Sequence, residues 1–137
     1  IRHALLVRSI RGRKIAMLRF GTEPFLECSS KGDKRFSALY ARLRSRSYST
    51  IEDIYQTSKI FEGGMTLSTR EAKGKLPINI EEVTRLYSHL WDIYFHENPD
   101  LLMYAKSFGG FSDIFGQSGH VCQAREIHRI VKGYVSG

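Results

Sequence analysis

This sequence has few cysteines, no long hydrophobic run and none of the common phosphate-binding loops. Its two cysteines, Cys28 and Cys122, are too few for a disulfide framework or a four-cysteine zinc site, so we expect two free thiols. No apolar run approaches the roughly 18 residues that would indicate a membrane span. Neither a Walker A loop nor a Gly-x-Gly-x-x-Gly motif is present, so the signatures of P-loop and dinucleotide-binding proteins are missing.

The composition is that of one ordinary folded domain. The chain has 137 residues and a mass of 15.7 kDa, and its 42% of hydrophobic residues excludes a largely disordered chain. A chain of this length buries about two-thirds of its unfolded surface and needs no disulfide. We therefore predict a single domain over residues 1–137. No signal-peptide pattern is visible, so the expected location is intracellular and cytoplasmic.

Positive charge is concentrated in the N-terminal third. The formal net charge is +7 and the isoelectric point is about 9.6. Residues 1–46 hold 12 Lys and Arg residues against three acidic residues, a net of +9, whereas residues 47–137 have a net of −2. If the basic side chains share one face, their field attracts phosphates, which predicts a nucleotide or nucleic acid as partner. The alternative is a solvated surface that only keeps the protein soluble.

Short apolar runs near the N-terminus predict a small antiparallel sheet. Residues 3–9 and 13–20 flank a basic turn and are typical of a β-hairpin, and a third strand is expected over residues 25–28. The polar loop 29–34 contains Gly32, whose backbone freedom allows either a simple turn or a cradle for an anion.

Helical patterns dominate the rest of the chain. Apolar spacing and capping residues predict helices over residues 36–46, 51–60, 69–73, 80–97, 99–108 and 120–132. The expected N-caps are Thr50, Ser68 (in a capping box with Glu71) and Asn79 (with Glu82). Residues 111–119 are expected to be a loop. The fold class is therefore α+β, with a small N-terminal antiparallel sheet and basic loop over residues 1–35 and a mostly helical body over residues 36–137.

The histidines give little support for a metal site. They are His3, His89, His96, His120 and His128. His89 and His96 lie seven positions apart on one predicted helix, which is two turns and not the single turn of a zinc-binding pair. The segment His120-Val121-Cys122 has no second cluster of ligands. We therefore expect no metal and no cofactor.

The predicted helix over residues 51–60 carries a polar face. Glu52, Gln56 and Lys59 are spaced i, i+4 and i+7, so a carboxylate, an amide and an amine lie on one side. In a pocket, Glu52 would serve as general acid or base, and Gln56 and Lys59 would orient a polar substrate. On the surface, the same residues would form an ordinary solvated face. The spacing alone leaves both interpretations open.

Residues 109–117 are rich in glycine and aromatic residues and contain one carboxylate, Asp113. Such a segment can form a loop on which a nucleic-acid base stacks. The alternative is a hydrophobic loop whose phenylalanines fill the core. Tyr40 and Trp91 are further aromatic candidates for stacking, but both fall on predicted helical stripes, where aromatic residues usually belong to the core.

The order of several motifs follows one known pattern. An aromatic–Ser–Asn–aromatic stretch corresponds here to Phe36-Ser37-Ala38-Leu39-Tyr40. A Ser-Glu-His run followed by Tyr-Gln and a lysine corresponds to Glu52, Tyr55, Gln56 and Lys59. An Asn-Pro-x-Leu-Leu helix and an aspartate before Trp-Gly correspond to Asn98-Pro99-Asp100-Leu101-Leu102 and to Asp113 before Phe115-Gly116. In this order the chain resembles the NADAR/YbiA-like proteins, a family of small α+β N-glycosidases. It departs from their pattern at Ala38, Asp53 and Phe115, which stand where the family has Asn, His and Trp.

The resemblance implies a YbiA-like fold and hydrolysis of an N-glycosidic bond in a nucleotide, ADP-ribosyl or nucleic-acid substrate. Breaking that bond builds positive charge on the sugar, which a carboxylate can stabilise. The expected catalytic residues are therefore Glu52 and Asp113. The expected substrate-binding residues are Lys59, Gln56, Tyr40, Tyr55, Phe115, Lys31, Lys34 and Arg35.

Two other functions compete with this hypothesis. A non-catalytic nucleic-acid-binding protein would spread basic residues over one face, with Arg11, Arg13, Arg42, Arg44 and Arg46 as the candidates. A protein-interaction module would instead expose an apolar patch. An enzyme should gather Glu52, Lys59, Asp113 and an aromatic residue in one concave pocket.

Overall fold

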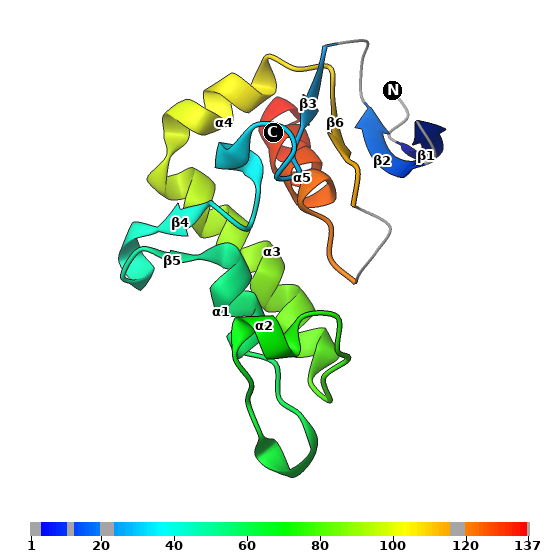
Figure 1. Ribbon diagram of the computed structural model, residues 1–137. Helices are drawn as coiled ribbons and strands as arrows, with labels where there is room; N and C mark the ends of the chain where they lie inside the picture. The colour runs from blue at the N-terminus through cyan, green and yellow to red at the C-terminus, as the bar shows by residue number, and fades with distance from the viewer. Residues whose placement is uncertain (1–3, 11–12, 20–23, 116–119, 137) are drawn as a thin grey trace.

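The structure is a computed structural model that describes residues 4–10, 13–19, 24–115 and 120–136, with side chains for 24–115 and 120–133. Its strands are β1 (Ala4–Ile10), β2 (Arg13–Arg19), β3 (Phe25–Glu27), β4 (Arg42–Leu43), β5 (Ser49–Thr50) and β6 (Gly110–Asp113). Its α-helices are α1 (Ile51–Thr57), α2 (Thr69–Ala72), α3 (Ile80–Glu97), α4 (Pro99–Lys106) and α5 (Gln123–Ser136). Residues 116–119 of the predicted aromatic loop lie outside the described residues. The combination of a sheet with a helical body is the predicted α+β class (Figure 1).

Four of the strands form one sheet in the order β1-β2-β6-β3 (Figure 1). The predicted hairpin is confirmed, because β1 pairs antiparallel with β2. The prediction of a loop over residues 111–119 is wrong at its start, because residues 110–113 form β6, which pairs antiparallel with β2 and parallel with β3. The sheet is therefore mixed and recruits one strand from the C-terminal half. The short β6 is buried along its whole length and finds backbone partners on both sides, which no local residue pattern reveals.

The predicted helix over residues 36–46 is absent from the structure. After one 3-10 turn, the chain bends and enters β4, which pairs with β5. The carbonyl of Ala38 accepts the N–H of Glu52 at 3.0 Å, so this segment satisfies an unpaired amide at the start of α1. The apolar spacing was misleading because Leu39 and Tyr40, two members of the supposed stripe, are 42% and 49% exposed.

Helix α3 is the centre of the helical body. It packs against α1, α4 and α5, and α5 in turn packs against β6 and β2 (Figure 1). Its buried residues are Val83, Tyr87, Leu90, Trp91, Tyr94 and Phe95. The ring of Trp91 stacks against Phe95 at a centroid distance of 5.8 Å and meets Tyr94 edge-on at 5.5 Å. Burial of each large apolar side chain stabilises the fold by about 1.5–3 kcal/mol. Trp91 is buried, so it is a core residue and not a surface on which a base stacks.

Helices α1, α2 and α3 begin at the residues that the local capping signals predict. Thr50 caps α1 through its side chain, and the predicted capping box that begins at Ser68 precedes α2. Asn79 precedes α3, but it makes no capping hydrogen bond. Its side chain instead accepts the N–H of Ile60 at 2.8 Å and donates to the carbonyl of Ser58 at 3.1 Å. Asn79 is the N-cap residue as predicted, and its Nδ2 also donates to Glu82 Oε1 at 3.3 Å, but two distant backbone groups take the place of the side-chain capping bond.

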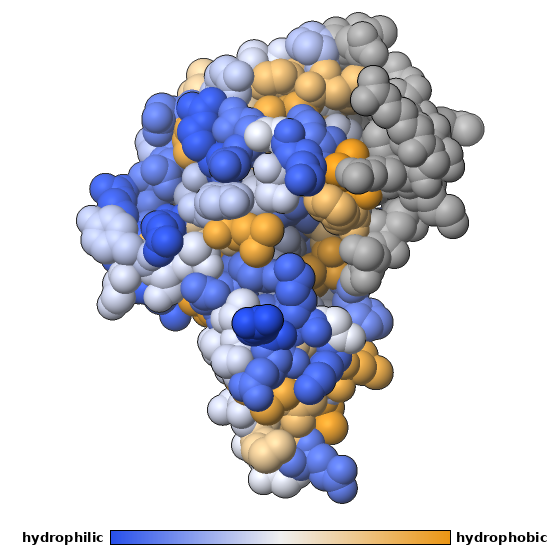
Figure 2. Space-filling view, in the orientation of Figure 1, coloured by the Kyte–Doolittle hydropathy of each residue, from blue (hydrophilic) through white to orange (hydrophobic). Residues whose placement is uncertain are grey.

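Residues 60–68 form a narrow extension below α1 and α2 (Figure 1). A bridge between Phe61 and Met65 closes this loop, and Gly63 and Gly64 between them both adopt a left-handed φ of 78°. Figure 2 shows apolar residues on the surface of the extension, and Met65 is 58% exposed. The extension therefore connects α1 to α2.

Candidate functional site

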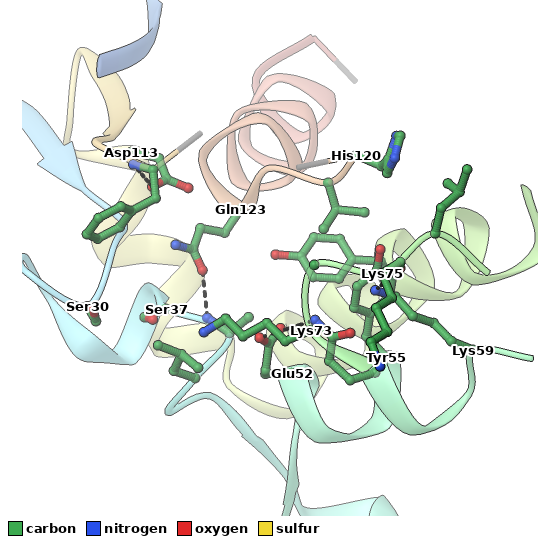
Figure 3. A pocket seen from close by; sticks show the side chains of 18 residues that line it. Ser30, Ser37, Glu52, Tyr55, Lys59, Lys73, Lys75, Asp113, His120 and Gln123 are labelled. Carbon is green, nitrogen blue, oxygen red and sulfur yellow. Dashed lines mark hydrogen bonds between the residues drawn. The ribbon is translucent and has the colours of Figure 1, made fainter. Parts of the chain in front are cut away.

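A pocket of about 530 Å³ opens where α1, the turn before β4, the segment after α2, the end of β6 and the start of α5 meet (Figure 3). Of the ten residues predicted to act in catalysis or substrate binding, six line this pocket. They are Glu52, Tyr55, Gln56, Lys59, Asp113 and Phe115. The two predicted catalytic carboxylates therefore share one cavity, and the polar face of α1 lines a pocket instead of an open surface.

Glu52 lies in the first turn of α1 and is half-buried, with its carboxylate at the pocket (Figure 3). The amide Nε2 of Gln56, one turn later, donates to Glu52 Oε2 at 3.4 Å. Acidic residues are stabilised in the first turn of a helix by the helix dipole. The local sequence therefore accounts for the position of this carboxylate.

Asp113 is the last residue of β6 and is only 3% exposed. Burial raises the pKa of its carboxyl group, and the nearby negative charge of Glu27 raises it further. A hydrogen bond from the N–H of Phe115 to Asp113 Oδ1, at 2.9 Å, and the side chain of Gln123 act in the opposite direction. Asp113 thus holds its proton to a higher pH than an ordinary aspartate, which suits a group that donates a proton.

Glu27 holds the chain behind Asp113 in place. Its two carboxylate oxygens accept hydrogen bonds from the Ser112 hydroxyl at 2.7 Å and from the N–H groups of Ser29 and Ile114, both at 3.2 Å. These contacts tie the end of β3 to the end of β6. Glu27 therefore fixes the end of β6, from which the side chain of Asp113 extends to the pocket.

The loop over residues 29–34 is a compact turn and not an anion cradle. The N–H of Gly32 donates to the Ser29 carbonyl at 2.9 Å, and the N–H of Asp33 donates to the Glu27 carbonyl at 3.1 Å. The N–H of Lys31 donates to the Ser29 hydroxyl at 3.2 Å. Because these amides are bonded within the loop, the simple-turn interpretation of Gly32 is the correct one.

Two buried polar atoms of the pocket make no hydrogen bond within the described part of the chain. They are the hydroxyl oxygen of Ser37 and the amide oxygen Oε1 of Gln56. An unpaired buried acceptor or hydroxyl costs about 1–3 kcal/mol, so such atoms in a native pocket indicate a ligand or water that pairs with them. Both atoms are therefore candidate contacts for a polar substrate.

The side chain of Lys59 is 4% exposed, and its amine bonds to backbone groups of the protein. Its Nζ donates to the carbonyls of Ala72 at 3.2 Å and Lys75 at 3.0 Å, and it lies 5.2 Å from the centre of the Tyr55 ring. Burial lowers the pKa of its amine, and the nearby Glu52 carboxylate opposes this change. Lys59 therefore fixes the segment after α2, which forms one rim of the pocket.

Two lysines that the sequence reasoning missed lie on that rim. Lys73 and Lys75 are exposed, flank Gly74 and line the pocket (Figure 3). The available signal was the run Lys73-Gly74-Lys75 directly after a predicted helix end. Other lining residues with polar side chains that were not predicted as site residues are Ser30, Ser37, Tyr87, His120 and Gln123.

Gln123 joins two walls of the pocket. It is the first residue of α5, and its Oε1 accepts the backbone N–H of Ala38 at 2.7 Å (Figure 3). This bond connects the start of α5 to the turn before β4.

The phenol of Tyr87, on α3, is influenced by both carboxylates of the pocket. Burial raises the pKa of its phenol well above the ordinary value, and the charges of both Glu52 and Asp113 raise it further.

Four of the predicted substrate-binding residues do not line the pocket. They are Lys31, Lys34, Arg35 and Tyr40. Arg35 pairs with Asp33 at 2.7 Å, and its guanidinium lies 4.9 Å from the centre of the Tyr104 ring. The amine of Lys34 lies 4.9 Å from the centre of the Tyr40 ring. The exposed cations at the pocket are therefore Lys73 and Lys75 and not residues 31, 34 and 35.

Among the described residues, no group of three or more His, Cys, Asp or Glu side chains is arranged to hold a metal ion. None of the described helices has the length and apolar character to span a membrane. Cys28 and Cys122 are buried free thiols, as predicted. No protein-family profile matches the chain, and no curated protein matches it.

Proposed function

We propose that this pocket hydrolyses an N-glycosidic bond in a nucleotide-type substrate, which is a nucleotide, an ADP-ribosyl compound or a nucleic acid. The proposal rests on one observation. Glu52 and Asp113, 61 positions apart in the sequence, line the same cavity. Two carboxyl groups in different surroundings are the arrangement that most glycoside hydrolases use. The motif order shared with the NADAR/YbiA-like proteins points to the same chemistry.

The two acids take different roles because their surroundings differ. Glu52 is half-buried, and its carboxylate stabilises the positive charge that develops on the sugar and accepts a proton from the attacking water. Asp113 is buried and has a raised pKa, so it donates a proton to the departing base nitrogen. The water oxygen then bonds to the anomeric carbon while the bond from that carbon to the base breaks.

The remaining lining residues suit the other parts of a nucleotide. The unpaired Ser37 hydroxyl and Gln56 Oε1 are placed to bond ribose hydroxyl groups. Phe115, 45% exposed at the pocket edge, offers a ring on which the base stacks. The amines of Lys73 and Lys75 attract phosphate at the rim.

A test of base release decides the proposal. The purified protein is incubated with nucleoside monophosphates, an ADP-ribosylated nucleoside and short oligonucleotides, and free base is measured by chromatography. On a substrate that the wild type cleaves, Glu52→Gln should lower kcat by about 100-fold or more with little change in KM.

The matched control is Asp53→Asn. Asp53 is the next residue of α1, is exposed, and lies outside the pocket lining. Its Oδ1 accepts the Thr69 hydroxyl at 2.8 Å, a bond that asparagine retains. This variant should keep wild-type activity. Absence of base release from every substrate class, or equal activity of the two variants, would contradict the proposal.

A further inference from the structure

The turn between β4 and β5 is a basic surface separate from the pocket. Residues 42–48, the basic turn, carry the exposed arginines Arg42, Arg44 and Arg46 and end in Tyr48, which is 60% exposed. Figure 2 shows strongly hydrophilic residues at this edge, where β4 and β5 lie in Figure 1. No residue of the turn lines the pocket. Arg11 of the predicted basic face lies outside the described residues, and only the backbone of Arg13 is described.

The basic turn is held in shape by Glu97 at the end of α3. The Glu97 carboxylate accepts the N–H of Arg44 at 2.8 Å and the N–H of Ser45 at 3.1 Å. The Arg44 guanidinium donates to the Glu97 carbonyl at 2.6 Å, and the Arg42 guanidinium donates to the Tyr48 carbonyl at 2.8 Å. Because Glu97 binds backbone amides, its charge organises the turn and leaves the arginine side chains at the surface.

The end of the turn is strained in a way that exposes an aromatic ring. Ser47 and Tyr48 have φ values of 57° and 60°, a left-handed conformation that residues other than glycine rarely adopt. Such strain persists only where the surrounding contacts enforce it, and it often marks a functional position. Here the Tyr48 side chain is 60% exposed and belongs to the same turn as three exposed arginines.

We propose that the basic turn is a contact surface for single-stranded nucleic acid. Each guanidinium has five N–H donors in a planar fork that fits phosphate oxygens, and the contacts of Arg42 and Arg44 above use one donor each. Tyr48 provides the ring on which an unpaired base stacks. A duplex offers no unpaired base for the ring, so the single strand is the preferred form. This surface goes beyond the proposed hydrolysis, because no residue of the basic turn belongs to the pocket lining.

The proposal is tested with the full chain by fluorescence anisotropy. The measurement follows binding of a fluorescein-labelled oligonucleotide of about 20 nucleotides over a range of salt concentrations. Single-stranded DNA, single-stranded RNA and a duplex form the three arms. The single strands should bind more tightly than the duplex, and affinity should fall steeply with salt. Arg46→Ala should lower the slope of log affinity against log salt by about 0.7, the value for one phosphate contact on a single strand. Arg46→Lys, which keeps the charge, should retain most of the slope.

Two variants test the role of the Tyr48 ring without adding strain to the backbone. Tyr48→Gly tolerates the left-handed φ, so a loss of binding is not explained by added strain. It should weaken binding by about fivefold or more, because base stacking on an aromatic ring is lost, whereas Tyr48→Phe should bind like the wild type. Arg85→Ala, at an exposed arginine of α3, is the charge control and should change little.

The results separate this surface from the pocket. Oligonucleotide binding and base release are measured separately, so failure of the hydrolysis proposal would leave this proposal intact. Absence of single-strand binding at low salt would overturn it. So would unchanged binding by Arg46→Ala and Tyr48→Gly, or a larger effect from Arg85→Ala than from Arg46→Ala.

Discussion

The side-chain oxygen of Gln123 accepts a hydrogen bond from the backbone N–H of Ala38 at 2.7 Å, across 85 positions of sequence. This bond joins the start of α5 to the turn that forms the opposite wall of the pocket (Figure 3). Burial raises the pKa of Asp113, and the Gln123 side chain opposes that rise. One residue therefore closes the pocket wall and influences one of its two acids.

Replacing Gln123 should destabilise the fold. Gln123→Leu leaves the N–H of the buried Ala38 without its acceptor, so the free energy of unfolding should fall by about 1–3 kcal/mol in urea denaturation. Lys132→Leu changes an exposed residue of the same helix and should alter the free energy of unfolding by no more than about 0.5 kcal/mol. Equal stability of the two variants would show that the Ala38 bond contributes nothing.

The raised pKa of Asp113 gives its effect on stability a definite pH dependence. The folded state binds this proton more tightly than the unfolded chain, so the stabilisation is complete below the unfolded pKa of about 3.9 and is lost as pH rises through the folded pKa. Asp113→Asn removes the titration. The free energy of unfolding of the variant, relative to wild type, should therefore be higher at pH 7 than at pH 4. A variant whose relative stability is greatest at pH 4 would contradict this sign.

Gly32 is required for space. A Cβ at this position would lie 2.2 Å from the Glu27 carbonyl oxygen, which belongs to the strand that supports Asp113. Gly32→Ala should therefore lower the free energy of unfolding by about 1–3 kcal/mol. Gly133 in α5 has open space around the same position, so Gly133→Ala should raise the free energy of unfolding by about 0.5–1 kcal/mol through better helix propensity. Thermal or urea unfolding of both variants should give opposite signs, and a neutral Gly32→Ala would refute the steric argument.

Several elements were predictable because their signals are local. Thr50 caps α1, the box that begins at Ser68 caps α2, and Pro99 occupies the first position of α4. In each case the residue bonds or constrains the backbone within a few positions, so neighbouring residues suffice to reveal it. Asn79 stands at the predicted N-cap position of α3 and its Nδ2 donates to Glu82 Oε1, but its side chain makes no capping hydrogen bond because the amide also bonds to residues 58 and 60.

The candidate site was only partly predictable, because some of its contacts join residues that lie far apart in the sequence. The spacing of Glu52 and Gln56 on α1 identified one polar face correctly. Lys59 shares that face, but its amine binds the carbonyls of Ala72 and Lys75, which no helical spacing indicates. The cations at the rim were expected from residues 31–35, and they come instead from residues 73 and 75.

The sequence by itself determined the α+β composition, the N-terminal hairpin, the long α3 and the residues that stand on one side of α1, because capping, turn formation and helical periodicity act over a few neighbouring positions. Only the tertiary structure decided that β6 is a strand and that Asp113 shares a cavity with Glu52. Those outcomes depend on backbone and side-chain partners up to 85 positions away, such as Gln123 and Ala38, and the chain brings such partners together only when its core is buried.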